Sequence, residues 1–320
     1  MRVLVMRAGA IGGYYGALLA EHGHDVTFVA RGAHLAALRE HGLELRRDGQ
    51  AKRQYPVQVV RSPADVPLNQ DGFDLVLFTV KTYDTIAAAT ALRPVIGPKT
   101  AVLTLQNGVD SVEELSTVLG VERVLAGTTL VATTLVAPGI IERTSPFQKI
   151  TLGEQDGTVT LRVETIAAAL RAAGIEAVVS NDPQRAVWEK FIVLAPHASI
   201  TSACQSPVGP IRETPEGATL YRTLIAEVVA VGRAAGVALT VDAVEATVAL
   251  VMSVPPTLKT SMQHDYERGH RVELEHLTGA VVRRGRATGV PTPAFDPLYA
   301  ILKVRALACG GSSQGEPVAR

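Results

Sequence analysis

The first half of the chain alternates short, almost continuously apolar runs with longer stretches that carry apolar residues at helical spacing. The apolar runs predict strands over Arg2–Met6, Val26–Ala30, Leu75–Thr79, Ala101–Leu105, Val124–Leu130 and Glu176–Ser180. The stretches between them predict helices over Tyr14–His22, His34–Glu40, Thr85–Val95, Ser111–Leu119 and Val163–Ala173. Near-continuous apolar runs are typical of buried parallel strands. Strands alternating with helices therefore indicate an α/β domain with a doubly wound, mostly parallel sheet.

Two further stretches of this first region are β-rich, and the pattern changes after residue 182. Leu43–Val60 is rich in β-formers, and Val131–Gly153 is typical of antiparallel strands with Pro138-Gly139 as their turn. From Pro183 onward helices are predicted over Pro183–Ala203, Thr214–Ala235, Val241–Val251 and Glu273–Arg286. Because Asp182 can cap a helix that Pro183 opens, we expect an α/β domain over residues 1–182 and an all-α domain over residues 183–308. The Gly/Ser/Gln-rich residues 309–320 are expected to form a disordered tail.

Composition removes several classes of function. The 320 residues carry 31 basic and 31 acidic side chains, so no net charge draws the chain to nucleic acid or to an anionic membrane. No run of 18 uncharged apolar residues predicts a membrane span. The two cysteines, Cys204 and Cys309, form no metal-binding or disulfide pattern and fit a cytoplasmic protein.

A glycine turn follows the first predicted strand. Arg7-Ala8-Gly9-Ala10-Ile11-Gly12 occupies the place of a dinucleotide fingerprint, between a strand and a helix. Gly9 would let the backbone approach a pyrophosphate, and Gly12 would let the helix pack closely on the strand. The first glycine of the fingerprint is Arg7 here, which costs about 1–2 kcal/mol if that position needs a positive φ. The alternative is a tight turn that serves packing alone.

The end of the second strand favours one dinucleotide over the other. NAD enzymes usually place an acid there, whereas this strand ends Ala30-Arg31-Gly32. An arginine can take the 2′-phosphate of NADP and stack on adenine. Arg31 therefore predicts NADP(H) as the cofactor, unless it is simply a solvated loop residue.

Six segments together resemble the ketopantoate reductase (2-dehydropantoate 2-reductase) family over about residues 1–305. They are Ala8–Gly12, Ala30–Gly32, Thr79–Lys81, Leu105–Val109, Trp188–Phe191, and Ser261-Met262-x-x-Asp265 leading to Glu273. The resemblance implies a Rossmann domain followed by a helical domain, and NADPH-dependent reduction of the ketone of a 2-oxo acid. It implies cofactor contacts by Ala8, Gly9, Ala10, Ile11, Gly12, Arg31, Lys81 and Asn107. Asn107 would also contact substrate.

The resemblance also implies a catalytic lysine. A reduced ketone leaves negative charge on oxygen, so a proton donor must lie within hydrogen-bonding reach of it. Lys190 stands on an otherwise apolar helix near the domain boundary, where its ammonium either reaches solvent or acts on substrate. Glu273 would assist Lys190 or bind a hydroxyl, and Ser261 would hold the substrate carboxylate. Their alternatives are structural: an acid at a helix N-terminus for Glu273 and a helix N-cap for Ser261.

Two positions depart from the family. Its lysine helix usually carries asparagines four and eight residues after the lysine, where this chain has Leu194 and Ala198. Both would line the same pocket as Lys190, and Pro196 between them should kink the helix. A site without those amides gains nothing from a substrate hydroxyl. A more apolar oxo acid or an imine is therefore one alternative substrate, and a non-catalytic NADP-binding protein is another reading.

The remaining sequence features are weaker evidence about function. A β-hydroxyacid dehydrogenase is disfavoured because the Gly-x-x-Gly-x-x-x-Asn pattern of that family does not precede Lys190. His264, His270 and His276 are six residues apart, so no metal site is expected. Arg283-Arg284-x-Arg286 is interpreted as a basic run that suits a helix C-terminus. The apolar helices Thr214–Ala235 and Val241–Val251 are compatible with a homodimer interface or with the core.

Overall fold

A computed structural model describes residues 1–47, 53–67 and 72–310 of the chain. The described chain forms two compact units. Unit 1 comprises Met1–Gln106 and Ser111–Ala186, and unit 2 comprises Asn107–Asp110 and the chain from Val187 onward. Helix α6 (Pro183–Cys204) begins at the predicted residue, but its first turn belongs to unit 1. The reason is local: Pro183 packs on Gly153, where an added Cβ would lie 3.2 Å from the proline ring.

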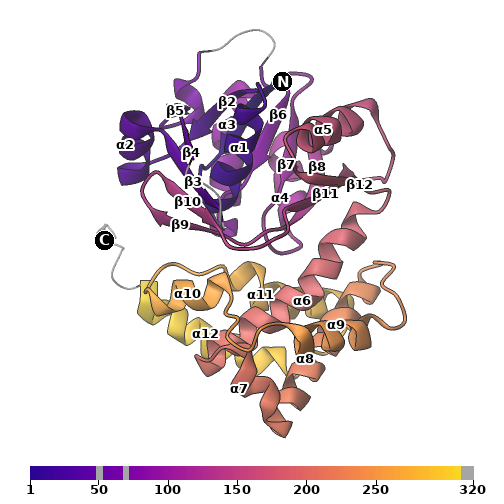
Figure 1. Cartoon of the computed structure of the whole chain (residues 1–320). Helices are drawn as coiled ribbons and strands as arrows, with labels where there is room; N and C mark the ends of the chain where they lie inside the picture. Colours follow the sequence, from indigo (N-terminus) through magenta and orange to yellow (C-terminus); the bar gives the residue numbers. More distant parts are fainter. Residues whose placement is uncertain (48–52, 68–71, 311–320) are drawn as a thin grey trace, which may run out of the picture. The chain divides into compact units, whose positions relative to one another are not determined.

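Unit 1 is built on an eight-stranded sheet with the order β12-β11-β8-β7-β6-β1-β2-β5 (Figure 1). Its strands are β1 (Arg2–Met6), β2 (Asp25–Val29), β5 (Gln58–Val60), β6 (Leu75–Phe78), β7 (Ala101–Thr104), β8 (Val124–Leu130), β11 (Lys149–Glu154) and β12 (Glu176–Val179). Neighbours pair in parallel except β11, which is antiparallel to β8. The run β5-β2-β1-β6-β7-β8 has the doubly wound order of dinucleotide-binding folds. The predicted α/β class is confirmed.

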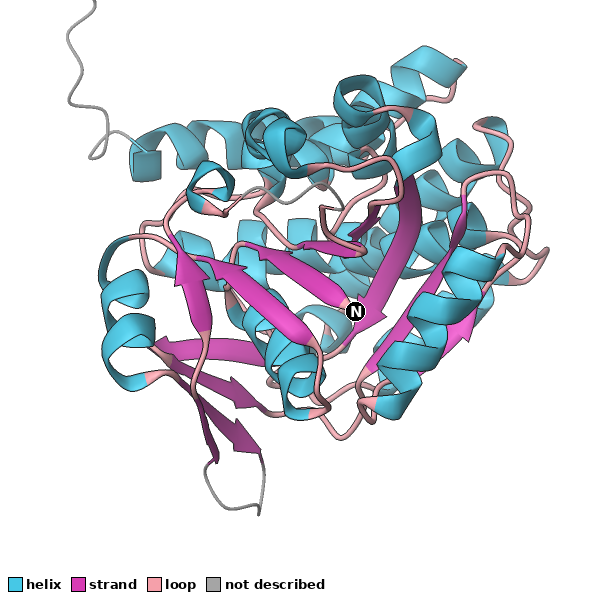
Figure 2. Ribbon diagram, turned by 90° about the horizontal axis from the view of Figure 1, so that it is seen from above, coloured by secondary structure: helices cyan, strands magenta, loops and turns pink. Residues whose placement is uncertain are grey.

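The strands are apolar on both faces because both faces are covered. Along β1, Val3 and Val5 enter one apolar cluster and Leu4 and Met6 the other. The helices of unit 1 are α1 (Ala10–Glu21), α2 (Gly32–His41), α3 (Thr85–Leu92), α4 (Ser111–Leu119) and α5 (Leu161–Ala172). Residues of α1 and α5 belong to the first cluster and residues of α3 and α4 to the second. Figure 2 shows helices flanking the strands of this sheet.

A second sheet explains why α1 is apolar on all sides. Its order is β4-β3-β10-β9, from β3 (Leu43–Arg47), β4 (Arg53–Tyr55), β9 (Thr133–Ala137) and β10 (Ile140–Arg143). The antiparallel pairing of β9 with β10 confirms the predicted turn at Pro138-Gly139. Helix α1 packs closely on this sheet, since a Cβ on Gly13 would lie 2.3 Å from Ile141. The helix is thus enclosed between two sheets, and it begins four residues before the predicted Tyr14.

The remaining short elements of unit 1 are 3₁₀ turns: η1 (Pro63–Asp65), η2 (Thr82–Asp84), η3 (Arg93–Val95) and η4 (Val121–Arg123). The last turn of the predicted Thr85–Val95 helix is η3, so α3 itself ends at Leu92. Pro94 within η3 accounts for this, because it cannot donate to the preceding α-helical turn.

Unit 2 is all-helical, as predicted. Beyond α6 it contains α7 (Val208–Glu213), α8 (Pro215–Ala234), α9 (Ala243–Ser253), α10 (Ser261–Glu267), η5 (Leu274–His276), α11 (Thr278–Thr288) and α12 (Phe295–Gly310). The expected helix Glu273–Arg286 is wrong in one respect: Leu277, with φ −111° and ψ −89°, separates η5 from α11. Helix α6 runs on through Pro196 to Cys204.

The apolar face of α8 lies in the core of unit 2, where Leu224, Val228 and Val231 are fully buried. Helix α9 also contributes Val251 to this core, whereas its Leu250 and Met252 are about half exposed. Helix α12 continues to Gly310, so it includes the first two residues of the tail predicted over 309–320. The remaining residues of that tail, 311–320, lie outside the described part of the chain. No described helix is long and apolar enough to cross a membrane.

The turn after β1 holds Arg7 at φ +74°, in the left-handed region. The position therefore needs the positive φ for which a dinucleotide fingerprint supplies glycine. The guanidinium of Arg7 forms an exposed ion pair with Asp84 at 3.2 Å. An exposed pair stabilises by at most about 1 kcal/mol, which does not clearly offset the backbone strain.

We predict that Arg7→Gly is more stable than Arg7→Ala by about 1 kcal/mol, because both lose the ion pair and only glycine relieves the left-handed strain. Urea unfolding of the two variants measures the difference. Equal stability of the two variants would show that the turn carries no such strain.

Candidate active site

The N-terminus of α1 is suited to an anion. Gly9 is its N-cap and makes no side-chain cap, and the first turn of the helix has no acidic residue. A Cβ added to Gly9 would meet nothing within 4 Å, so the space in front of the turn is open. Ala8 is buried, and Ala10 and Ile11 are half-buried. Free amide groups at a helix N-terminus fit the pyrophosphate of a dinucleotide.

Gly12 allows α1 to lie close to the sheet. An added Cβ would lie 2.3 Å from Oγ1 of Thr79 and 2.6 Å from the carbonyl oxygen of Arg7. Thr79 in turn donates to that same carbonyl at 3.0 Å. A side chain at residue 12 would push the helix away from the turn, which is the packing role expected of this glycine.

His34 holds the turn from the other side, and sequence reasoning missed it. Its Nδ1 accepts a hydrogen bond from the backbone amide of Gly139 at 2.9 Å, so Nε2 carries the proton and donates to the carbonyl of Ala8 at 2.6 Å. Burial lowers the pKa of His34, which favours this neutral form. The partners lie 26 and 105 residues away in the sequence, so no local pattern points to this contact.

Two arginines follow neighbouring strands. Arg31 is exposed at the start of α2, after β2, and Arg61 is exposed directly after β5. The pairing of Val29 with Val60 places these strand ends side by side. Neither guanidinium has an ion-pair partner among the described residues. Arg61 was not predicted, because the sequence does not show which strands are neighbours.

Lys81 follows β6 in unit 1, where it is half-buried and precedes η2. It thus stands at the carboxyl end of a central strand, the edge at which ligands bind in doubly wound sheets.

Two other predicted site residues, Lys190 and Asn107, lie together in unit 2. Nζ of Lys190, on α6, donates to Oδ1 of Asn107 at 2.9 Å, although the two residues are 83 apart in the sequence. Lysine has no acceptor, so the amide oxygen of Asn107 must face it, and the amide nitrogen remains as a donor. The structure therefore brings together two residues that the sequence predicted separately.

Burial lowers the pKa of Lys190 to about 8, and the carboxylate of Glu273 opposes this shift. Glu273 is itself buried, with 5% of its surface exposed, and it precedes η5 rather than opening an α-helix. An ammonium with such a pKa holds a proton near neutral pH and can release it.

The other predicted substrate contacts are placed as follows. Ser261 is exposed and is the first residue of α10, whose N-cap is Thr260; the alternative that Ser261 caps this helix is therefore wrong. Leu194 is half-buried and packs against the apolar core of unit 2. Ala198 belongs to that core and has no exposed surface. Contact of any of the three with substrate stays a prediction.

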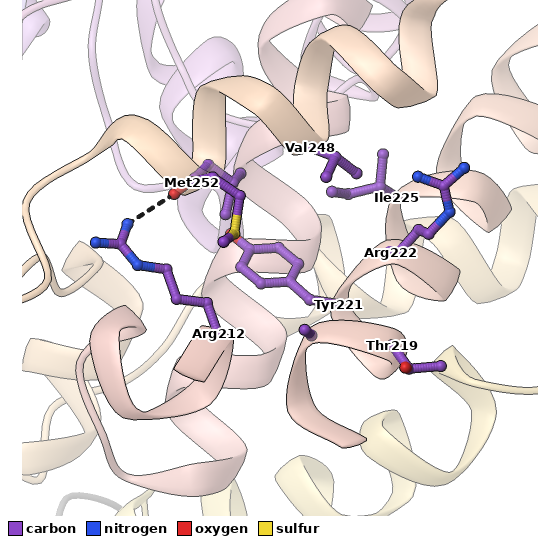
Figure 3. A pocket seen from close by; sticks show the side chains of 9 residues that line it. Arg212, Thr219, Tyr221, Arg222, Ile225, Val248 and Met252 are labelled. Atoms are coloured by element: carbon purple, nitrogen blue, oxygen red, sulfur yellow. Dashed lines mark hydrogen bonds between the residues drawn. The ribbon is translucent and has the colours of Figure 1, made fainter. Parts of the chain in front are cut away.

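A cavity of about 300 Å³ lies elsewhere in unit 2, between α7, α8 and α9 (Figure 3). Tyr221, Ile225 and Val248 line it, and its two arginines already have partners: Arg222 pairs with Glu245, and Arg212 donates to the carbonyl of Val251 at 3.0 Å. None of the predicted site residues lines it. In the described part of the chain, no group of three or more His, Cys, Asp or Glu side chains could hold a metal ion.

Comparison with known proteins identifies the same family over both units. The family model described as "Ketopantoate reductase PanE/ApbA" matches residues 3–157, and its C-terminal counterpart matches residues 182–306. A 2-dehydropantoate 2-reductase of Halobacterium salinarum is 33% identical over 306 residues, which is 95% of this chain and 98% of that protein.

Solved structures agree. A PanE/ApbA family ketopantoate reductase of Ralstonia eutropha has a TM-score of 0.88 at 33% identity and covers 97% of this chain and 99% of its own. D-mandelate dehydrogenase in complex with NADH and anilino(oxo)acetate has the same TM-score at 20% identity, with 97% and 100% coverage, so it shares the fold.

Proposed function

Because the chain belongs to the ketopantoate reductase family, whose members are NADPH-dependent oxidoreductases, we propose that it reduces a 2-oxo acid to the 2-hydroxy acid with Lys190 as proton donor. The observation that carries this proposal is the hydrogen bond between Lys190 and Asn107, together with the lowered pKa of the ammonium. A half-buried ammonium held by an amide is already oriented, so little reorganisation is needed when the substrate oxygen becomes negative.

The cofactor's phosphates would be held by unit 1. The open N-terminus of α1 would take the pyrophosphate at Ala8, Gly9, Ala10, Ile11 and Gly12. Arg31, with Arg61 beside it, would take the 2′-phosphate, and Lys81 would contact the cofactor at the end of β6. NADPH, when bound, supplies the hydride that reduces the carbonyl carbon.

The chain's own residues complete the reaction. Lys190 gives the proton from Nζ to the carbonyl oxygen as it becomes an alkoxide, and the product is the neutral hydroxyl of the 2-hydroxy acid. Asn107 holds Nζ in place through its amide oxygen, and its amide nitrogen can donate to the substrate. Glu273 raises the pKa of Lys190 against the effect of burial and so favours its protonated form. Ser261 would hold the substrate carboxylate.

Two classes of 2-oxo acid are candidates. The relatives named 2-dehydropantoate 2-reductase support 2-dehydropantoate, which carries a hydroxyl. The apolar side chain of Leu194, one helical turn from Lys190, favours a more apolar 2-oxo acid, because it offers that hydroxyl no hydrogen bond. The same reasoning admits an imine of similar shape.

Replacement of Lys190 tests the proton donor. We expect Lys190→Ala to lower kcat by about a hundredfold or more, because the alkoxide then has no positioned acid. Lys259→Ala is the matched control, since Lys259 forms a partly exposed ion pair with Glu267 at 2.8 Å and its loss should leave kcat unchanged. Steady-state NADPH oxidation measures both, and unchanged turnover of Lys190→Ala would remove Lys190 from the mechanism.

The pH dependence of kcat follows from the same group. Since the acid must be protonated, reduction should be constant at neutral pH and fall about tenfold per pH unit above the Lys190 pKa of about 8. Oxidation of the 2-hydroxy acid needs the free amine and should rise up to that pH. Lys190→Arg should be slower without the alkaline decline, because a guanidinium stays protonated. An unchanged decline in Lys190→Arg would assign it to another group.

Arg31 is tested by cofactor binding. Fluorescence titration should show that NADPH binds more tightly than NADH, and Arg31→Ala should remove most of this difference.

A substrate series separates the remaining alternatives. Turnover is compared for 2-dehydropantoate and branched apolar 2-oxo acids. If Leu194 excludes the hydroxylated acid, kcat/KM favours the apolar acids, and Leu194→Asn shifts it towards 2-dehydropantoate by about tenfold. A preference of the native chain for 2-dehydropantoate would refute the apolar alternative, and cofactor binding without oxidation by any of these acids would mark a non-catalytic NADP-binding protein.

A further inference from the structure

The segment Asn107–Asp110 belongs to unit 2, although it is preceded and followed by residues of unit 1. Gln106, directly before it, is buried in unit 1 and donates to the carbonyl of Val80 at 3.1 Å and to Oγ1 of Thr85 at 2.9 Å. The chain therefore changes units between two consecutive residues. Something in unit 2 must hold this four-residue segment, because its own length is too short to fold.

Asp110 supplies that attachment. Its side chain is only 12% exposed, and two arginines of α11 engage its two oxygens separately. Arg284 donates from Nε to Oδ1 at 2.7 Å, and Arg283 donates from Nη2 to Oδ2 at 2.8 Å. Arg284 also donates to the carbonyl of Val109 at 3.3 Å. Ion pairs in which both carboxylate oxygens are bound by guanidinium groups fix orientation as well as position.

The segment also lies against η5, the turn that Glu273 precedes. Gly108 has φ +88°, and a Cβ there would lie 2.7 Å from the carbonyl oxygen of His276, the last residue of η5. Arg283 reaches the same turn, since its Nη1 donates to the carbonyl of Glu275 at 2.7 Å. Thus η5, α11 and residues 107–110 form one connected group of hydrogen bonds, and Asn107 is its end nearest Lys190.

We propose that Asp110, bound by Arg283 and Arg284, is a positioning residue that holds Asn107 against Lys190 for the proton transfer. The inference rests on the proposed function of Lys190. It gives a specific task to two of the three arginines in the run Arg283-Arg284-x-Arg286, which the sequence suggested only as charges at a helix end. The third, Arg286, pairs instead with the exposed Asp296 at 3.2 Å.

A direct titration of Lys190 tests the proposal without substrate. The chain has seven lysines, so NMR of the protein labelled at lysine Cε, with Lys190→Arg for assignment, can follow this one amine. Asn107 stabilises the charged form of Lys190. Loss of the ion pairs of Asp110 with Arg283 and Arg284, which we call the clamp, should therefore lower the titration midpoint of Lys190 by about half a pH unit or more. Glu273 remains as the charged group that acts on Lys190 in every variant.

Variants that remove charges of opposite sign distinguish the positioning of Asn107 from a direct electrostatic effect on Lys190. Through space alone, Asp110→Asn removes a negative charge and lowers the midpoint, whereas Arg284→Gln removes a positive charge and raises it. If both act by releasing Asn107, both lower it. A rise in Arg284→Gln therefore overturns the proposal. Arg283→Gln, whose side chain is half exposed, is the milder second variant, and Arg286→Gln is the matched control that should leave the midpoint unchanged.

Kinetics provide the second readout. Asp110→Asn and Arg284→Gln should lower kcat by about tenfold to a hundredfold with KM for NADPH unchanged, because misplacing the acid affects the chemical step. In an Asn107→Ala background Asp110→Asn should cause no further loss, since its effect passes through Asn107. An equal loss in that background contradicts the clamp. If instead Lys190→Ala keeps its turnover, the proposed function fails, while the NMR titration still reports on the clamp.

Discussion

The site depends on a lysine ammonium that is partly withdrawn from water and held by an amide. Burial alone would drive Lys190 towards its neutral form, and its pKa falls to about 8. The hydrogen bond to Asn107 and the charge of Glu273 act in the opposite direction, so the proton remains available near neutral pH. Unit 2 therefore balances desolvation against two polar partners that come from different segments of the chain.

In unit 1 the main constraint is a different one: the N-terminus of α1 must stay open for an anion. The turn is held by contacts on its far side: Thr79 donates to the carbonyl of Arg7 and His34 to that of Ala8. Glycine at residue 12 lets α1 lie against the sheet, and the second sheet covers its opposite side. With its backbone fixed in this way, the turn tolerates Arg7 at a positive φ.

Much of the fold was predictable because local patterns suffice for buried strands and capped helices. Strand β8 and helix α4 have the predicted bounds, and for α4 the preceding Asp110 and the following Gly120 mark both ends. Helix α12 was missed because apolar residues occur on all its sides, including the exposed Ile301, Val304 and Leu307, so no periodicity marks it. The break at Leu277 was missed because the apolar spacing of Leu274, Leu277 and Val281 suits one helix.

The sequence by itself determined the glycine turn after the first strand and Arg31 after the second, which follow from local rules of backbone and side-chain chemistry. Its resemblance to a known family pointed to Lys81, Asn107, Lys190 and Glu273 as site residues. Only the tertiary structure decided that Asn107 lies at Lys190 and that Arg283 and Arg284 bind Asp110, because those partners are 83 to 174 residues apart. Pairings across such separations are fixed by the packing of whole helices, which no short stretch of sequence encodes.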